Sequence, residues 1–578
     1  MIKLFKYLKN YKKEAVLGPL GKLFEAVLEL IVPLVMAQII ETGIKNGDRP
    51  YIYKMGAVLV LLGVLGLASS LTAQYFAAKA AMGFGTELRR DLFRHINTFS
   101  HTDIDSFGSA TLVTRMTADI NTVQTGVNML LRLFLRAPFI VVGALIMTLT
   151  ISVKLTLIFL VFTPILWLVI DFVTRRTVPM YKTIQKKLDN TSMIVGENIS
   201  GVRVIRAFSR QHDERERFRD STDSLQNIQL SAGRVSAVMS PLTYVFVNIA
   251  IMLILWFGGK NVNTGSLTQG EVVALIDFMM QILLSLIRLA ELMLSLTKAQ
   301  ASSARILDVF ARQPSLTDSG NADPAPAEGA PAVEFRNVSF SYHDSERPAL
   351  EGISFTAMKG ETVGIIGGTG CGKTTLVNLI PRFYEASCGE VLVNGSSVKD
   401  YTFEGLRGSI GIVPQKAVLF KGTIRENMQW RKRNASDDEI MKALTTAQAA
   451  DFVKEKPGGL DYVTEQSGRN FSGGQRQRLT IARALVGSPD ILILDDSASA
   501  LDLATDAALR HAIASDTDRM TVFIVSQRVS SIRNADRIIV LDDGRVAGIG
   551  THTELLENCA VYKEICSSQL TEEVQDNV

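Results

Sequence analysis

The chain has 578 residues, which is too long for one ordinary domain, so several domains are expected. A formal net charge of +3 gives no case for nucleic acid binding. Hydrophobic residues make up 47% of the chain and the mean hydropathy is positive, at +0.19, and together these values indicate membrane segments. We expect no removable signal peptide after the basic N-terminus. The cysteines match no zinc spacing, so we expect reduced cytosolic thiols at Cys371, Cys388, Cys559 and Cys566.

Six long apolar segments fill the first half of the chain. A bilayer core of roughly 30 Å needs about 20 helical residues, and each segment is long enough to cross it. One such segment is compatible with a buried helix of a soluble protein, but six in a row predict a membrane domain. The expected spans cover approximately 15–40, 53–82, 130–153, 155–173, 235–257 and 272–296.

The connections between these spans predict an orientation. Those after the second and fourth spans are long and rich in arginine and lysine, whereas the other three are short. By the positive-inside tendency, the long connections and both termini lie in the cytoplasm. Apolar positions recur at helical spacing in 180–188, so we expect the spans to continue as long intracellular helices.

Charged side chains within the spans are costly in lipid, so we expect them to face a bundle interior or an aqueous cavity. A substrate or ion path and a structural polar contact are both open interpretations. Glu29 is the best functional candidate because it lies in the middle of its span. The charged positions are Glu25, Glu29, Asp277, Arg288 and Glu291.

The composition changes after the sixth span. Residues 318–332 are rich in Pro, Ala, Gly and Asp without apolar periodicity, which is typical of a linker. Thereafter short β-rich runs alternate with helices, as in α/β nucleotide-binding domains. We therefore expect a six-helix membrane domain at 1–317, a linker at 318–332 and an α/β domain at 333–578.

A glycine-rich turn between a predicted strand and a predicted helix matches the phosphate loop pattern G-x-x-x-x-G-K-[ST]. Its glycines let several backbone N–H groups point into one anion-sized hollow. Lys373 is expected to reach the β and γ phosphates and the Thr374 hydroxyl to bind Mg²⁺. A plain loop is the alternative, but the strand–loop–helix context favours nucleoside triphosphate binding. The loop comprises Gly367, Gly368, Thr369, Gly370, Cys371, Gly372, Lys373, Thr374 and Thr375.

Two further motifs follow downstream. Residues 490–496 are typical of a buried strand that ends in two carboxylates, Asp495 and Asp496. Near a phosphate loop, an aspartate at a strand end supplies the acidic neighbour that Mg²⁺ needs. Between the loop and this strand, a second helix start suited to anions is opened by Ser472, Gly473, Gly474 and Gln475.

Together with the six spans, these motifs closely resemble one half of a bacterial ATP-binding cassette (ABC) exporter, over nearly the whole chain. The resemblance implies alternating access, with two ATP molecules held between two nucleotide domains. Each ATP site combines the phosphate loop of one subunit with the signature (Ser472–Gln475) of the other.

The resemblance also implies roles for single positions. Tyr342 is expected to stack on adenine, and Gln415 to contact Mg²⁺ together with Thr374 and Asp495. Four segments match further family features: coupling segments at 105–119 and near 200–208, a loop touching the intracellular extensions at 465–468, and the loop after the strand-end acids at 499–502.

Two departures from the family pattern fall on the same composite site. Asp496 stands where such exporters usually have a glutamate that activates the attacking water, and its side chain is shorter by one C–C bond, roughly 1.5 Å. A misplacement of about 1 Å can cost on the order of 10²-fold in rate. Gln527 replaces the usual histidine; a glutamine can hydrogen-bond a γ phosphate, but it cannot supply a protonated imidazole. Tolerated drift is the alternative, but we interpret the site as degenerate, binding ATP firmly and hydrolysing it slowly.

The sequence thus predicts an ATPase that exports amphipathic drugs, lipids or peptides across the cytoplasmic membrane of a bacterium. We expect a heterodimer in which a different half-transporter supplies the missing glutamate and histidine. The lipid bilayer is the other expected partner, and nucleic acid is not. A slow homodimeric exporter and an ATP-gated regulator or channel are the alternatives. The six spans argue against a soluble ABC ATPase that does no transport.

Overall fold

The computed structural model describes residues 1–318, 323–324, 327, 329–342, 347–497, 501–515 and 520–575. Two compact units divide the chain: unit 1 contains 1–97 and 110–312, and unit 2 contains 98–109 and 313–578. The expected linker at 318–332 and the expected motif at 499–502 lie partly outside the described residues.

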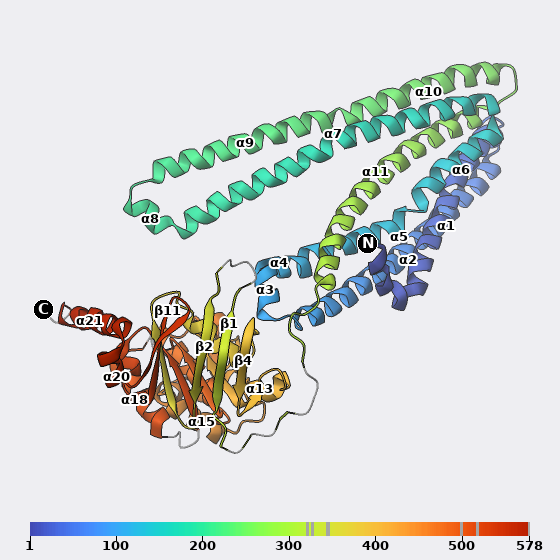
Figure 1. Ribbon diagram of the computed structural model, residues 1–578. Helices are drawn as coiled ribbons and strands as arrows, with labels where there is room; N and C mark the ends of the chain where they lie inside the picture. Colours follow the sequence, from blue (N-terminus) through green and yellow to red (C-terminus); the bar gives the residue numbers. More distant parts are fainter. Residues whose placement is uncertain are drawn as a thin grey trace. The chain divides into compact units, whose positions relative to one another are not determined.

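Unit 1 is entirely helical. Six helical stretches in the described part of the chain are long and apolar enough to cross a membrane, which confirms the predicted membrane domain (Figure 1). The longest single helices have 48 residues, or about 70 Å at 1.5 Å per residue, more than twice the thickness of a bilayer core. The six stretches are Ile2–Ile44, Arg49–Ile96, Ser109–Ile151, Val153–Ser200, Gln211–Asn263 and Gln269–Ala311.

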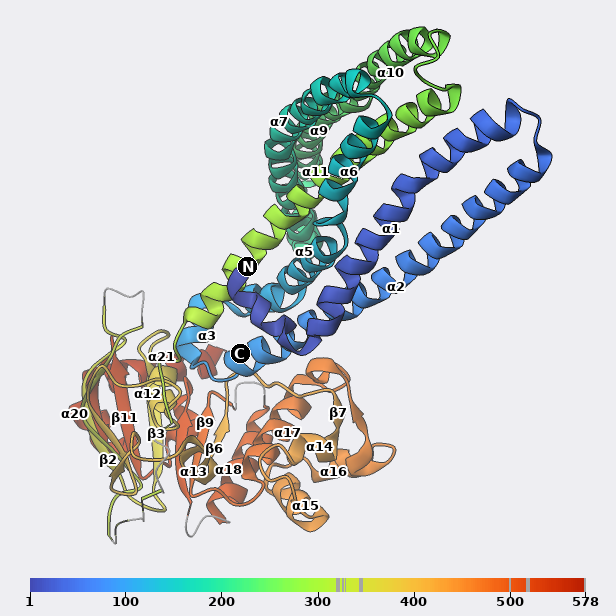
Figure 2. The ribbon, with the colours of Figure 1, turned by 90° about the vertical axis from the view of Figure 1, so that its right-hand side faces the viewer.

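Within unit 1 the helices pack as antiparallel neighbours. Figure 2 shows α1 and α2 side by side, and Figure 1 shows α7 running along α9 and α10. Small residues permit close approach where α5 meets α11, because a Cβ added at Gly126 would lie 2.4 Å from the Ala299 Cβ. The helices are α1 (Lys12–Gln38), α2 (Arg49–Ile96), α4 (Ser109–Thr114), α5 (Ile120–Leu133), α6 (Arg136–Ile151), α7 (Val153–Ser200), α8 (Val202–Ala207), α9 (Gln211–Ala237), α10 (Met239–Asn263) and α11 (Gln269–Ala311).

Charged side chains inside the membrane domain form a network between α1, α2 and α6. Lys22 donates to Glu25 at 2.5 Å and to Ser70 at 2.9 Å. Arg136 donates to Glu29 at 2.6 Å and lies 3.6 Å from Glu25. Lys22 and Arg136 are only 5% and 8% exposed, so two buried cations are matched by two carboxylates. Glu29 therefore has a structural partner, and its proposed part in a substrate path rests on its sequence position alone.

We predict that Arg136→Met destabilises the protein, because it leaves the Glu29 carboxylate without its buried partner. Removing one member of a buried ion pair typically costs about 3–5 kcal/mol, and because the Glu29 side chain is 38% exposed, solvent screening should place the loss below this range. Thermal unfolding of the detergent-solubilised chain measures the effect, and adding Glu29→Gln should restore most of the loss. Arg210→Met is the matched control, because Arg210 pairs with Asp213 at 2.5 Å and both side chains are exposed, at 71% and 54%. An equal loss in both arginine variants would show that burial does not set the cost.

Unit 2 is built on a six-stranded sheet of order β12-β11-β3-β10-β9-β6, in which only β12 runs antiparallel. A four-stranded antiparallel sheet has the order β2-β1-β4-β5. The strands are β1 (Val333–Phe340), β2 (Leu350–Ala357), β3 (Thr362–Gly367), β4 (Cys388–Val393), β5 (Ser396–Ser397), β6 (Ile410–Val413), β9 (Ile491–Asp495), β10 (Thr521–Val525), β11 (Arg537–Asp542) and β12 (Arg545–Gly550). This confirms the predicted α/β domain.

The five parallel strands of this sheet are buried on both faces, which explains why they are apolar at nearly every position, whereas β12 at the edge has no buried residue. Along β9, Ile491 and Ile493 belong to the core shared with the four-stranded sheet, whereas Leu492 and Leu494 belong to the opposite core. Figure 2 shows the helices of that opposite core grouped together: α14 (Ile424–Met428), α15 (Asp437–Thr446), α16 (Ala450–Lys454) and α17 (Gly473–Leu485).

Candidate functional site

The register of three parallel strands assembles the site. Val525 at the end of β10 pairs with Ile365 of β3 on one side and with Asp495 of β9 on the other. Because parallel strands present their carboxyl ends at one edge of a sheet, the loops after β3, β9 and β10 meet there. These loops carry the glycine-rich turn, Asp496 and Gln527. The structure thus brings together three motifs that are far apart in the sequence.

The glycine-rich turn adopts backbone conformations that favour glycine. Gly370 has φ of 84° and Gly372 has φ of 97°, in the left-handed region. A Cβ at Gly372 would lie 2.7 Å from the Ala349 carbonyl oxygen, so there is no room for a side chain at this position. A Cβ at Gly368 or Gly370 would meet no atom within 4 Å, which leaves the turn open on one side. The turn leads directly into α12 (Lys373–Leu379).

A buried ammonium group lies over this turn. The Lys373 Nζ donates to the carbonyl oxygens of Gly367 at 2.8 Å and Gly368 at 2.7 Å. The neighbouring Thr374 hydroxyl donates to the Asp495 Oδ1 at 3.0 Å. A cation, a hydroxyl and a carboxylate therefore converge on the open side of one loop.

Asp495 is buried at the end of β9, and burial raises the pKa of its carboxyl above the ordinary value. The hydrogen bond from Thr374 and the charge of Lys373 oppose this rise, whereas the charge of Asp496 adds to it. A bound cation would favour the ionised form, because an opposite charge nearby offsets the cost of burying the carboxylate.

The two departures from the family pattern lie at this same edge. Asp496 has φ of 45°, a left-handed conformation that aspartate tolerates better than most side chains, and its N–H donates to the Val525 carbonyl at 2.9 Å. Gln415 donates from Nε2 to the Asp496 Oδ2 at 3.2 Å. The Gln527 side chain is exposed two residues beyond Val525. Asp495, Asp496 and Gln415 thus lie at the same edge of the sheet, and their roles toward magnesium and water stay predictions.

The remaining predicted residues occupy separate places. The Tyr342 hydroxyl lies 2.9 Å from the Thr375 hydroxyl, so this aromatic ring flanks the start of α12. In the signature, Ser472 and Gln475 form a capping box at the start of α17, where Ser472 and Gly473 are exposed. Within the described residues we find no hydrogen bond between the signature and the phosphate loop, so the signature is not part of this chain's own cluster.

Sequence reasoning missed the side chains that tie the first coupling segment to unit 2. Helix α3 (His101–Phe107) belongs to unit 2, where the Tyr384 hydroxyl donates to the Asp105 Oδ2 at 3.0 Å. The His101 ring stacks on Phe383 at 4.6 Å, and Tyr384 meets the Tyr342 ring edge-on at 5.5 Å. No sequence signal identifies Tyr384, because its partner Asp105 is 279 residues away.

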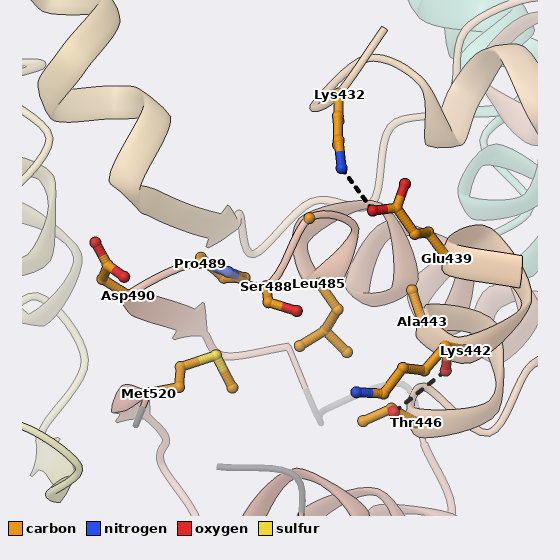
Figure 3. A pocket seen from close by; sticks show the side chains of 11 residues that line it. Lys432, Glu439, Lys442, Ala443, Thr446, Leu485, Ser488, Pro489, Asp490 and Met520 are labelled. Carbon is orange, nitrogen blue, oxygen red and sulfur yellow. Dashed lines mark hydrogen bonds and ion pairs between the residues drawn. The ribbon is translucent and has the colours of Figure 1, made fainter. Parts of the chain in front are cut away.

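The cavities of unit 2 include one beside these elements and one away from them. The larger, of about 930 Å³, opens beside Thr374, Gln415 and Asp495, and the stacked rings of Phe420 and Trp430 line its far part. Figure 3 shows the smaller, of about 440 Å³, where Lys432 pairs with Glu439 at 2.5 Å. The smaller cavity contains none of the predicted site residues, so we assign it no part in nucleotide binding.

The residues present fit a nucleoside triphosphate with Mg²⁺. The open loop and the Lys373 ammonium suit phosphate oxygens, and the Thr374–Asp495 pair offers the oxygen ligands that Mg²⁺ prefers. Among the described residues, no group of three or more His, Cys, Asp or Glu could hold a metal ion unaided. This agrees with Mg²⁺, which usually binds through one or two protein oxygens, waters and substrate phosphates.

Comparisons with known proteins identify the family. The family model for the ABC transporter transmembrane region matches residues 16–286, and the ABC transporter model matches residues 350–499. The chain is also 38% identical over 573 residues to YfiB of Bacillus subtilis (strain 168), an uncharacterized ABC transporter ATP-binding protein, covering 99% of each protein. The chain belongs to the ABC transporters.

Two further similarities extend this result. The ABC transporter described here is 31% identical over 578 residues to the ATP-dependent lipid A-core flippase of Hahella chejuensis, covering 99% of this chain and 97% of that protein. Its fold matches the structure of a bacterial Atm1-family ABC exporter with ATP bound, with a TM-score of 0.79 over 96% and 98% of the two chains, at 23% identity. This protein is therefore a multi-pass membrane ATPase that binds ATP, with its membrane region and nucleotide domain on one chain.

We predict that Lys373→Ala weakens ATP binding by about 10- to 100-fold, the range for a lost charge-assisted hydrogen bond. Titration of the purified full chain with a fluorescent ATP analogue measures the change. Lys421→Ala, which removes an exposed lysine, should bind as the wild type does. Unchanged affinity after Lys373→Ala would contradict the assigned role.

We predict opposite effects of Asp495→Asn on stability and on Mg²⁺-dependent ATP binding. Because the pKa of Asp495 is raised in the folded chain, its ionisation lowers stability as pH rises from the ordinary carboxyl value through the raised one. The asparagine variant, without that charge, should melt at a higher temperature than the wild type at pH 7 without nucleotide. Its Mg²⁺-dependent ATP affinity should fall about 10- to 100-fold. Asp490→Asn, at the exposed start of the same run, is the control, and a similar melting shift there would refute the burial argument.

Proposed function

We propose that this chain is the degenerate-site half of a heterodimeric ABC exporter in the cytoplasmic membrane of a bacterium, with both termini in the cytoplasm. The observation that carries the proposal is the combination of an intact phosphate loop with Asp496 and Gln527 at the adjoining strand ends. The groups for holding ATP are present, whereas those for activating water and supplying a proton are altered.

The chain's own residues have distinct proposed tasks. When bound, ATP with Mg²⁺ supplies the phosphoanhydride bond whose hydrolysis drives transport. Lys373 and the loop N–H groups would hold phosphate oxygens, Thr374 and Asp495 would hold Mg²⁺, and Tyr342 would orient the adenine. Asp496 would orient a water from a shorter side chain than glutamate, while its hydrogen bond with Gln415 holds the carboxylate in place. The result is firm binding with slow turnover at this chain's own site.

Two exposed features support assembly with a second chain. The signature starts α17 with Ser472 and Gly473 exposed, so its helix start is available to another subunit's nucleotide. Helix α8 has no buried residue, and beside it the Phe208 side chain is 74% exposed. Ile199 and Val204, exposed by 72% and 61%, belong to the same segment, and grouped exposed apolar side chains mark contact surfaces. We propose that the α8 segment docks against the large cavity of a partner's nucleotide domain.

We also propose that the transported substrate is amphipathic. An amphipathic substrate is supported by the apolar character of the six spans and by the similarity to a protein named as a lipid A-core flippase. Fusion of the membrane region to the nucleotide domain favours export, because importers of this class usually carry the two on separate chains.

We predict an asymmetry between the two ATP sites of the purified transporter. Asp496→Asn should lower ATP turnover only modestly, because this site already contributes little. Replacing the partner's catalytic glutamate with glutamine should nearly abolish turnover.

Conversely, Asp496→Glu combined with Gln527→His should raise turnover at this site about tenfold or more, since a well-placed general base contributes at least that much.

Steady-state phosphate release from the reconstituted complex measures these rates. Asp438→Asn, an exposed aspartate in α15, is the matched control for charge removal. Equal losses from Asp496→Asn and from the partner variant would refute the asymmetry. Brisk hydrolysis by a preparation containing this chain alone would refute the heterodimer.

A further inference from the structure

The loop that carries Gln527 is held mainly through its backbone. We call Ser526–Val529 the switch loop; it connects β10 to α19 (Val529–Ile532). The Ser526 N–H donates to the Ile365 carbonyl at 3.1 Å, and the Ser526 hydroxyl accepts from the Arg528 N–H at 2.9 Å. Gln527 and Arg528 themselves are exposed. The position of the Gln527 side chain therefore depends on how firmly these peptide groups are fixed.

A single side chain from the last helix of the described chain fixes the other side of the switch loop. Gln569 of α21 (Ala560–Gln575) donates from Nε2 to the Gln527 carbonyl at 2.6 Å. Its Oε1 accepts from the Val529 N–H at 2.8 Å. A glutamine amide offers a donor and an acceptor in fixed relation, so one group clamps two peptide groups on either side of Arg528.

Helix α21 is itself anchored beneath the site. Cys559, Tyr562 and Cys566 pack in one buried cluster with Ile366, Ile532 and Val540. The Tyr562 ring is fully buried, and its hydroxyl lies 2.7 Å from the His552 Nδ1 of α20 (His552–Asn558). Ile366 immediately precedes Gly367, so the cluster that holds α21 also includes the strand that leads into the phosphate loop. The side chain that clamps the switch loop thus stands on a rigid support.

We propose that Gln569 is a positioning residue, through which the C-terminal helix sets the switch loop so that Gln527 can reach the γ phosphate. This inference rests on the proposed ATP site, in which the Gln527 side-chain amide would donate a hydrogen bond to a γ-phosphate oxygen. The γ phosphate is what distinguishes ATP from ADP, so Gln569 contributes to the preference for ATP over ADP at this chain's own site. A merely structural role would affect both nucleotides alike.

The test compares ATP and ADP affinities of the purified full chain, by displacement of a fluorescent nucleotide in the presence of Mg²⁺. Gln569→Met keeps the length of the side chain and removes both hydrogen bonds. We expect about a tenfold loss of ATP affinity, the size of one charge-assisted hydrogen bond, with ADP affinity unchanged. Hydrogen exchange at the Val529 amide should accelerate, because Gln569 protects it. Ser568→Ala, one residue earlier on α21, is the control and should behave as the wild type.

Two further variants make the result decisive. Gln569→Glu keeps the acceptor for Val529 but places a carboxylate oxygen against the Gln527 carbonyl, so it too should lose ATP affinity selectively. Gln527→Ala should show the same selective loss, and its combination with Gln569→Met should cost no more than either change alone.

The outcomes separate the two proposals. Wild-type ATP and ADP affinities in both Gln569 variants, alongside a selective loss in Gln527→Ala, would overturn the positioning role and leave the role of the switch loop standing. Equal weakening of ATP and ADP binding in the Gln569 variants would also overturn it, as structural damage. Wild-type behaviour of Gln527→Ala would overturn the proposed role of Gln527 and the inference built on it.

Discussion

The pairing of β3, β10 and β9 in one parallel register is the constraint on which the nucleotide domain depends. Val525 of β10 is paired in register with Ile365 of β3 and with Asp495 of β9. The position of β10 therefore fixes where the other two strands end. A register error would displace the acidic strand end from the phosphate loop by about 3.3 Å per residue, more than a hydrogen bond tolerates. Both faces of the sheet are buried, and this burial enforces the register, because a slip of one residue would turn every side chain to the wrong core.

The buried charged residues that suit ATP and Mg²⁺ lower the stability of the chain when no ligand is bound. Lys373 and Asp495 are both buried, and burying Asp495 disfavours its charged form. Their mutual proximity, with Thr374 between them, offsets part of this cost. Charged side chains are also buried in the membrane domain, where Lys22 and Arg136 are paired with two carboxylates inside the protein. In both units, these buried charges have an opposite charge close by.

Much of this arrangement could be predicted from the sequence. The spans follow from hydropathy, and the phosphate loop and strand-end acids follow from local patterns, because each is set by neighbours in the chain. The pairing of Glu29 with Arg136 joins residues 107 positions apart, and that of Gln527 with Gln569 spans 42. Such pairs depend on how helices and loops pack, which no local pattern encodes. The assignment of Asp496 and Gln527 as a degenerate site came from the family pattern alone, while the structure adds that both stand at the ends of adjacent strands.

The clamp between α21 and the switch loop bears on how this transporter is handled in the laboratory. An affinity tag or fluorescent protein fused after Val578 would lie close in the sequence to α21, the helix that carries Gln569. A bulky fusion that displaced or partly unwound that helix would move Gln569 and, through it, the switch loop at the ATP site. Kinetic constants from such fusions would then describe a perturbed enzyme. Tags placed ahead of Met1, or removed by a protease before assay, would leave this attachment as it is in the native chain.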